Sequence, residues 1–464
     1  MRVRIAALVL LAASHASADE VQVSLLTFSP DAHPFLSFGH SALWIHDPRM
    51  ATDDVDLVYN FGTFAFGSPS VIADFARGQL SYWLSVGTLA WTLESYGGSG
   101  RTVRSQRVNL TPAEADRLER ALVEGLRPES RFYAYGYVEN NCATRLRDAL
   151  DEASGGALRA AFTGSTGRTF RAEVARVLGD RPVFGAMVDA AMGPALDRPV
   201  DAWSATFVPD RLAAALRRGT RDGGAPLVVE ERTLVDHRRW FPERAAAHPR
   251  AWALAIGAVM GLVLGGPPPP APSPTSRRGG GEGKSEGALR FEADVALPSP
   301  RTWRGVGGEV LLGATVAVLG AAIGGAGSFL LLFGVIHPLA RWNVNVLHAA
   351  PSALWLVREG VRMARGEPAA SGRALRVSGL GLALSATGLV LSLTGATPQP
   401  VGGFAALVMP LWVGLVARLW RATQPGGGRR VVGGGGGVAD DEVVAVGPVE
   451  GGVTGVRRSG GGAP

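Results

Sequence analysis

The chain contains a single cysteine, Cys142, in the stretch YVENNCATRLRDAL at residues 137–150. Asn140 and Asn141 precede it, and the residues after it are typical of a helix. An asparagine cap leaves amide groups open at the first turn of a helix, and the positive end of the helix dipole there favours thiolate over thiol. Arg145, one turn on, adds positive charge. The pattern predicts a reactive thiol, and an inert buried thiol is the alternative.

A thiol that transfers acyl groups needs a base. His40 is the best candidate, because it stands inside the strand-like apolar run SFGHSALWIH (37–46), where a stiff element can aim it. The alternative for His40 is a structural histidine. Histidines in turns, at a strand end or in basic sequence are weaker candidates: His33, His46, His237 and His248.

The spacing of His33, His40 and His46 matches no common zinc template, so neither a metal nor a cofactor is expected. A serine hydrolase is not indicated, because no G-x-S-x-G elbow occurs.

The elements that would position Cys142 and His40 include both helices and strands, so a domain of the α+β class is expected. Strands are expected at 21–28, 37–46, 57–61, 81–91 and 101–110, as an antiparallel set. Helices are expected from about 111 to 126, from Cys142 to Gly155, and at 170–178 and 209–217. Thr111, Pro112 and Glu114 form a capping box ahead of the first helix. The apolar stretch 82–93 is a candidate acyl-chain surface or an ordinary core strand.

The N-terminus has the pattern of a signal peptide, residues 1–18. Arg2 and Arg4 precede a short apolar stretch, and Ala16-Ser17-Ala18 forms an A-x-A cleavage site. Residues 19–218 are then expected as an exported domain, followed by a basic connector at 219–250. A lone cysteine in an exported domain has no internal disulfide partner, which leaves an intermolecular bridge, an inert buried thiol or a reactive thiol.

The second half of the chain is apolar and is expected to form a transmembrane domain over 251–420. Five apolar segments can be read, at 251–266, 310–336, 343–357, 377–395 and 402–419. With five spans, the arginine-rich segments 267–309 and 358–376 and the C-terminus lie in the cytoplasm, while the uncharged segment 396–401 lies outside. This is the positive-inside pattern, and four spans would break it. A disordered linker is expected at 267–305 and a disordered Gly-rich tail at 421–464.

The formal net charge is +6 and the isoelectric point is about 10.0. The arginines concentrate beside the apolar segments, where they act as topology signals. No RNP, zinc-finger or helix-turn-helix pattern is present, so nucleic acid is not an expected partner.

Three stretches of the exported half resemble one family: LLTFSPDAHPFLSFGHSALWI (25–45), LVYNFGTFAF (57–66) and YAYGYVENNCATRLRDAL (133–150). They are similar to the exported domain of the Lnb-type lipoprotein N-acyltransferases. The stretch HPLARWNVNVLHAAPSALWL (337–356) resembles that family's transmembrane domain. The long Gly/Pro-rich linker is a departure from the family pattern.

The resemblance implies a circularly permuted papain-like (NlpC/P60-related) domain, followed by an α-helical transmembrane bundle of about five helices in the bacterial cytoplasmic membrane. It also implies that Cys142 and His40 are the catalytic pair. Asn60 and Tyr59 are then candidates for orienting His40, and Asn141 for the oxyanion site. The implied reaction moves the sn-2 acyl chain of a diacylglyceryl-modified lipoprotein to the α-amine of its N-terminal cysteine.

Two other functions stay open at this point. One is an envelope hydrolase acting on a phospholipid or lipoprotein ester or a cell-wall amide. The other is a non-catalytic envelope protein that binds a partner. The expected partners are diacylglyceryl-modified lipoproteins or membrane phospholipid, and the lipid bilayer itself.

Overall fold

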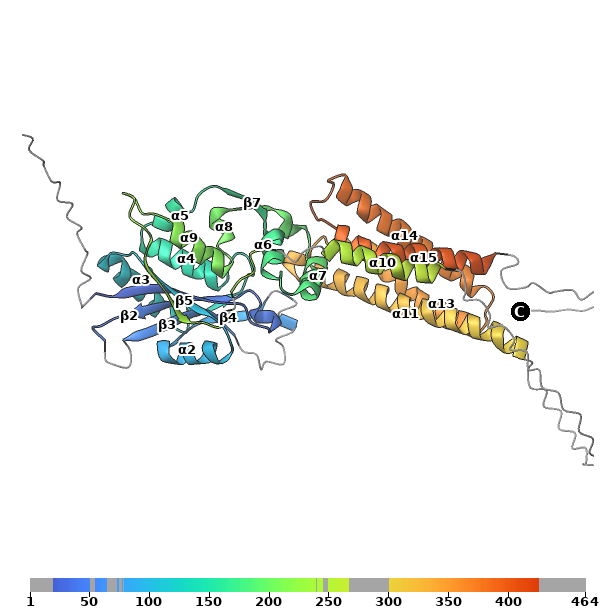
Figure 1. Cartoon of the computed structure of the whole chain (residues 1–464), viewed down its shortest axis with the longest axis horizontal. Coiled ribbons are helices and arrows are strands. Elements are labelled where there is room, and N and C mark those ends of the chain that lie inside the picture. The colour runs from blue at the N-terminus through green and yellow to red at the C-terminus, as the bar shows by residue number, and fades with distance from the viewer. Residues whose placement is uncertain are drawn as a thin grey trace, which may run out of the picture. The chain divides into compact units, whose positions relative to one another are not determined.

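The structure is a computed structural model of the chain. It describes residues 20–50, 55–64, 73–74, 77, 79–238, 240–244, 249–266 and 300–424. These residues form an α+β domain and, C-terminal to it, a set of helices (Figure 1). The predicted signal peptide, most of the predicted linker and the predicted tail after 424 lie outside the described residues.

The domain is built on a seven-stranded sheet with the order β6-β4-β3-β2-β1-β5-β9, in which every neighbouring pair is antiparallel. This confirms the expected α+β class with an antiparallel sheet. The strands are β1 (Gln22–Phe28), β2 (His40–His46), β3 (Asp56–Thr63), β4 (Ser81–Thr88), β5 (Val103–Val108), β6 (Phe132–Ala134) and β9 (Val228–Val235).

Helices cover both faces of this sheet (Figure 1). On one face, side chains of α3 (Pro112–Gly125), α4 (Cys142–Ala153) and α9 (Pro209–Arg218) share a core with β1, β2 and β3. On the other face, α2 (Leu89–Gly98) packs on a smaller core. Successive side chains of β2 point to opposite faces of the sheet. Leu43 and Ile45 therefore belong to the first core, and Ala42 and Trp44 to the second. His40, two residues before Ala42, therefore lies on the α2 side.

The sequence located most element boundaries, and the differences are local. The capping box at Thr111 and Glu114 is present, and the helix after Cys142 ends at Ala153. The strand expected at 81–91 stops at Thr88, because the Thr88 hydroxyl caps α2, which begins at Leu89. The sheet also extends past residue 218, so the part of the expected connector at 228–235 is a strand, β9, paired with β5.

The remainder of the domain is a small helical layer held by buried ion pairs. It comprises α5 (Ala157–Ala161), β7 (Ser165–Thr169), α6 (Phe170–Val177), α7 (Pro182–Ala191), η2 (Pro194–Asp197), β8 (Pro199–Asp201) and α8 (Ala202–Ala205). The Glu173 carboxylate, 1 % exposed, accepts hydrogen bonds from Arg176 and Arg211. Arg176 in turn pairs with Asp210 at the start of α9.

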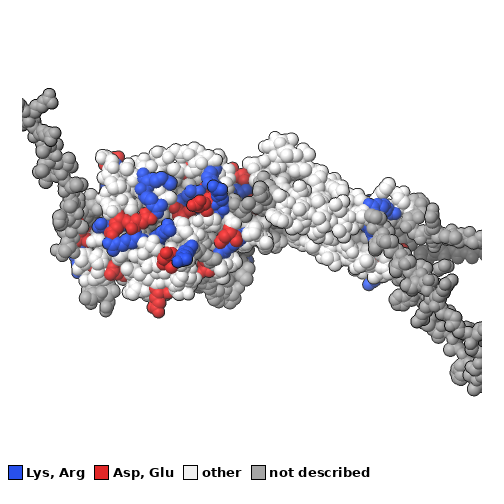
Figure 2. Space-filling view, viewed as in Figure 1, with Lys and Arg blue, Asp and Glu red and all other residues white. Residues whose placement is uncertain are grey.

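The C-terminal helices are α10 (Pro249–Gly265), α11 (Pro300–Ile336), α12 (Asn345–His348), α13 (Trp355–Ala364), α14 (Ala370–Leu393) and α15 (Gly402–Thr423). Among the described residues, three of them are long and apolar enough to cross a membrane: α11, α14 and α15. The exposed residues of this set include Leu262, Leu332 and Val390, which accounts for the largely white surface in Figure 2. Since α11 begins at Pro300, the end of the predicted linker is helical.

The two shorter apolar segments have different secondary structures. The segment at 251–266 forms one helix, α10, which packs against α15 through close contacts of Gly257 and Gly261. The segment at 343–357 is broken into α12, the 3-10 turn η4 (Pro351–Leu354) and the start of α13. It packs along α11, where glycines bring the two backbones together. The five-span count therefore stays a prediction.

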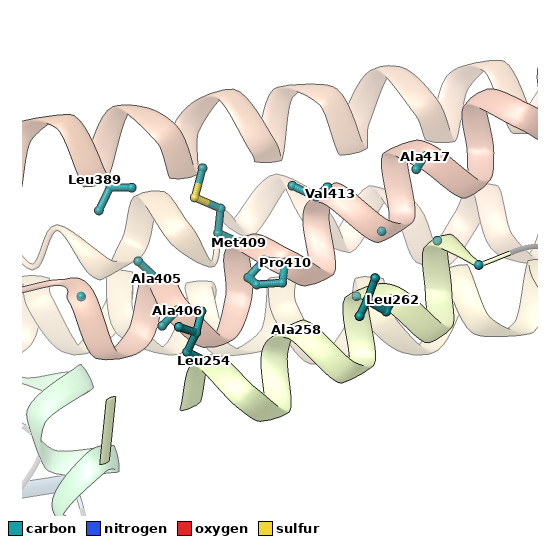
Figure 3. Close-up of a pocket in the computed structure, with 15 residues that line it drawn as sticks. Leu254, Ala258, Leu262, Leu389, Ala405, Ala406, Met409, Pro410, Val413 and Ala417 are labelled. Atoms are coloured by element: carbon teal, nitrogen blue, oxygen red, sulfur yellow. The ribbon is translucent and has the colours of Figure 1, made fainter. Parts of the chain in front are cut away.

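A cavity of about 790 Å³ opens between α10, α14 and α15. Its lining is almost entirely apolar and includes Leu254, Met409, Pro410 and Val413 (Figure 3). None of the residues singled out from the sequence for chemistry lines this cavity.

Candidate active site

Cys142 and His40, 102 residues apart in the chain, both lie beside Gly62. A Cβ built on Gly62 would lie 3.6 Å from the Cβ of Cys142 and 3.9 Å from Cε1 of His40. Gly62 has φ +98°, a conformation that only glycine adopts readily. A side chain at position 62 would contact both Cys142 and His40, so the glycine keeps the space beside the two residues open.

Where the pairing of β2 with β3 ends, the backbone amide of Ser41 becomes available to the sulfur of Cys142. The register of β2 against β3 ends at the Leu43–Tyr59 pair, and β3 carries an irregularity between Phe61 and Thr63. The N–H of Ser41 is thus released from that ladder, and it hydrogen-bonds the sulfur of Cys142. The N–H of Ala143 bonds the same sulfur. The thiol therefore lies among backbone donors from two separate elements.

The N-terminus of α4 is fixed by Asn141, as the sequence predicted. The Asn141 side-chain oxygen accepts from the amides of Ala143 at 2.9 Å and Thr144 at 3.0 Å, and the Thr144 hydroxyl completes a capping box. The Asn141 amide nitrogen donates to the carbonyls of Tyr137 and Phe207. Through these bonds Asn141 holds Cys142 in position at the start of α4.

Asn60 and Tyr59 lie on opposite faces of β3. The side-chain oxygen of Asn60 lies 3.2 Å from Nε2 of His40, and its amide nitrogen donates to the Val58 carbonyl. With that orientation of the amide, Nε2 of His40 donates and Nδ1 is left as the basic nitrogen. Tyr59 instead packs into the core with Leu43, on the side of the sheet away from His40. The structure brings Asn60 to the candidate base and not Tyr59.

Burial keeps both members of the pair uncharged. It lowers the pKa of His40 to about 4, with the positive charge of Arg101 adding to the effect and the bond to Asn60 opposing it. Burial also raises the pKa of the Cys142 thiol, although the amides of Ser41 and Ala143 and the charge of Arg101 act in the other direction. The expectation of a resting thiolate is therefore wrong, because desolvation outweighs the helix terminus.

Arg101 is the strongest charge acting on this thiol, and no sequence pattern marks it for that role. Arg145, which the sequence favoured, bonds Asn140 and lies over the ring of Tyr133. Arg101 is 2 % exposed, donates from Nε to the Ser29 carbonyl at 2.7 Å, and leaves Nη2 without a hydrogen-bond partner. It begins the predicted strand 101–110 beside other arginines, so only the fold distinguishes it.

Aromatic rings connect Arg101 with His40. The guanidinium carbon of Arg101 lies 4.8 Å from the centre of the Tyr96 ring, and the rings of Tyr96 and His40 are stacked at 6.0 Å. The Phe28 ring packs on both Tyr96 and His40. This cluster sets the angle of the imidazole and holds a cation close to it.

A second group of aromatic rings lies on the other side of Cys142. Tyr82 and Tyr135 stack at 4.0 Å, and Tyr133 packs near Tyr82 at 6.4 Å. The charge of an ionised Cys142 raises the pKa of each of these tyrosines further, after burial, which places all three near the sulfur. Tyr82 belongs to the stretch that the sequence marked as a candidate acyl-chain surface.

A comparison with protein families bears on this geometry. Residues 12–174 match the model of the Lnb N-terminal periplasmic domain. The N-terminal domain is therefore Lnb-like over these residues. A search of curated proteins found no match, and neither did a search of solved structures.

The Lnb match covers His40, Asn60, Arg101 and Cys142 and ends inside α6. A periplasmic domain followed by three helices that are able to cross a membrane makes this a membrane protein with a periplasmic domain.

The other histidines of the Lnb-type domain lie apart from this site. Nδ1 of His46 bonds Asp56 at 2.9 Å, at the opposite end of β2 from His40. His33 stands in the turn before η1 (Pro34–Leu36) and is exposed. Within the described ranges, no three His, Cys, Asp or Glu side chains gather as a metal site would require.

Proposed function

We propose that this protein is a membrane-anchored acyltransferase that makes lyso-form lipoproteins through a thioester on Cys142. The donor is the sn-2 ester of a diacylglyceryl-modified lipoprotein, and the acceptor is the α-amine of its N-terminal cysteine. The observation that carries the proposal is the meeting of Cys142 and His40 at Gly62 inside an Lnb-type domain.

The first half of the reaction forms the thioester. Nδ1 of His40 takes the proton of the Cys142 thiol as the sulfur attacks the carbonyl carbon of the sn-2 ester. The oxygen of the tetrahedral intermediate accepts hydrogen bonds from backbone amides beside the sulfur, those of Ser41 and Cys142, because the Ala143 amide is already bonded to Asn141. The C–O bond to glycerol then breaks, and the departing glyceryl oxygen takes the proton from His40.

The second half transfers the acyl chain to nitrogen. The neutral α-amine attacks the thioester carbonyl, and its surplus proton passes to Nδ1 of His40. The C–S bond breaks, and the sulfur of Cys142 recovers the proton from the imidazole. The products are an amide at the lipoprotein N-terminus and a free hydroxyl at sn-2. A thioester favours aminolysis over hydrolysis more than an ester does, so a cysteine suits amide formation.

Neutral resting states suit this cycle. A thiol and an imidazole that are both uncharged need no counterion while the site is empty, and each charge forms only as the substrate arrives. The buried charge of Arg101 then stabilises the sulfur when it becomes negative. Asn60 keeps the imidazole in the tautomer that can accept a proton at Nδ1.

The proposal includes the finer architecture that the resemblance implies. The periplasmic domain is a permuted papain-like fold, with the histidine before the cysteine along the chain. The C-terminal half crosses the cytoplasmic membrane five times, and the residues between β9 and α10 join it to the domain. Tethering the domain to the membrane raises the effective concentration of a donor ester that lies at the membrane surface.

Mass spectrometry of lipoprotein N-terminal peptides tests the function. Cells that rely on this protein for acylation are compared with the same cells carrying Cys142→Ala or His40→Ala. The proposal predicts N-acylated, lyso-glyceryl cysteine with the unchanged protein and diacylglyceryl cysteine with a free amine in both variants. Acylation that persists in Cys142→Ala cells would contradict it. Free fatty acid without any N-acyl product would identify a hydrolase.

A further inference from the structure

Helix α7 (Pro182–Ala191) carries an apolar face that the protein leaves uncovered. It is one of two short apolar helices among the described residues, and none of its residues is buried. Val183 is 75 % exposed and Met187 is 64 % exposed. Ala186 is exposed as well, so one side of the helix presents only apolar atoms to its surroundings.

The single charged residue of α7, Asp189, is partly exposed and is paired with a buried arginine of the domain. The Asp189 carboxylate pairs with Arg171 at 2.9 Å, and the same guanidinium donates to the Asp189 carbonyl. Arg171 also pairs with the buried Asp197. The polar side of α7 is therefore anchored within the domain, which fixes the direction in which Val183 and Met187 point.

The C-terminal end of α7 is hydrogen-bonded to the segments that link the long helices. Asn343 and Asn345 donate to the Ala190 carbonyl at 2.7 Å and 3.0 Å. Gln399 donates to the Met192 carbonyl at 3.1 Å, and the Gly193 amide donates to the Leu339 carbonyl at 2.8 Å. All three donating side chains are buried: Asn343, Asn345 and Gln399. The end of α7 is therefore held by a buried hydrogen-bond network.

These contacts place α7 level with one end of the candidate membrane spans. Leu339, Asn343 and Asn345 follow the C-terminus of α11, and Gln399 lies between α14 and α15. Trp342, beside Asn343, is 88 % exposed. Exposed tryptophan is typical of the boundary between a membrane and water. A short helix that is apolar on its free side and lies at this level has the features of an interfacial helix.

We infer that α7 lies in the lipid surface on the periplasmic side, with Val183 and Met187 among the acyl chains. The partner of this face is the bilayer itself. The helix would hold the Lnb-type domain against the membrane leaflet in which the proposed lipid substrate lies. This inference needs the membrane placement of the long helices and does not depend on the chemistry of Cys142.

Site-directed fluorescence tests the inference on the full chain. Cys142→Ser removes the only cysteine, so single cysteines at Val183, Met187 or Val123 can each carry one environment-sensitive nitrobenzoxadiazole label. Val123 is the matched control, because it is an apolar residue on α3, 54 % exposed. The labelled proteins are reconstituted into phosphatidylcholine–phosphatidylglycerol vesicles with or without lipids that carry a shallow nitroxide.

The inference predicts blue-shifted emission at positions 183 and 187, and nitroxide quenching at least about threefold stronger than at position 123. Melting temperatures measured for the three labelled proteins show that each is folded. Equal emission and equal quenching at 183, 187 and 123 would overturn the inference. Quenching at all three positions would also overturn it, since the contact would not be specific to α7. Because Cys142 is absent throughout, a failure of the proposed acyl transfer does not affect this result.

Discussion

At the scale of residues, the site is a neutral pair whose charge is controlled by what surrounds it. Burial dominates the pKa of both Cys142 and His40, and Arg101 is the nearest strong charge for each. A cysteine at a helix start, taken alone, indicates a thiolate. Our proposal therefore uses general-base catalysis, in which the proton moves when the substrate binds.

The pKa of His40 makes a prediction about pH. The imidazole must be unprotonated to accept the thiol proton, and its pKa is about 4. Activity should therefore stay level from pH 8 down to about pH 5 and fall about tenfold per pH unit below pH 4. Single-turnover release of the sn-2 chain from a donor with a blocked amine measures this step without titrating the acceptor. A midpoint near 6.5, the ordinary value for histidine, would show that His40 is not held in this buried state.

Arg101→Met tests the role of the buried cation. Removing the charge should raise the pKa of His40 and raise that of the Cys142 thiol further, because Arg101 lowers both. We expect the acid limb of the pH profile to move upward and iodoacetamide labelling of Cys142 at pH 8 to slow by about tenfold. Arg104→Met is the matched control, since Arg104 lies three residues further on, in β5, with its guanidinium over the Trp240 ring. Equal profiles for the two variants would mean that Arg101 is only structural.

At the scale of elements, the site depends on how two strands and one helix end. The β2–β3 ladder stops short of Ser41, β3 bends at Gly62, and α4 begins at Cys142. Each of these local features is ordinary, and together they bring an amide, an imidazole and a thiol to one place. The catalytic geometry that we propose is therefore a property of element boundaries.

Gly62→Ala separates backbone strain from crowding of the site. Both Gly62, at φ +98°, and Gly155, at φ +66°, lose about 1–2 kcal/mol of stability when they gain a side chain. Only the new methyl group at 62 would meet Cys142 and His40, since nothing lies within 4 Å of a Cβ at Gly155. We expect similar melting temperatures for Gly62→Ala and Gly155→Ala, with at least about a tenfold loss of acylation in the first alone. Full activity in Gly62→Ala would contradict the meeting of the pair at this point.

The sequence predicted those helices and strands that are marked by patterns of neighbouring residues. Thr111 with Glu114 marked one helix start, Asn141 marked another, and alternation marked β1 and β2. What it missed depends on distant contacts: β9 becomes a strand only because β5 offers an open edge. Arg101 and Tyr59 show the same limit. Their roles follow from the face of the sheet on which each side chain falls, and no local pattern records that.

At the scale of the whole molecule, an Lnb-type periplasmic domain is joined to helices with membrane character. Three helices meet the length of a span, while α10 and the broken segment α12–α13 are shorter. The arrangement of arginines argues for five crossings, because leaving out a short apolar segment as a span places an arginine-rich segment outside.

Cysteine accessibility tests this topology. In a Cys142→Ser background, Ser285 and Ala396 are each changed to cysteine and treated with a membrane-impermeant maleimide on intact spheroplasts. Five crossings predict labelling at 396 and none at 285 until the membrane is opened. Labelling of position 285 on intact spheroplasts would show that α10 does not cross and that the count is wrong.

The most direct test of the account is to trap the acyl group on Cys142. The purified full-length protein is mixed with a synthetic diacylglyceryl lipopeptide whose α-amine is acetylated, so that the thioester forms and finds no acceptor. The account predicts that the peptide containing Cys142 gains the mass of one acyl chain and loses it on treatment with hydroxylamine. An acyl group found on another residue, or consumption of the sn-2 ester while Cys142 stays unmodified, would contradict it.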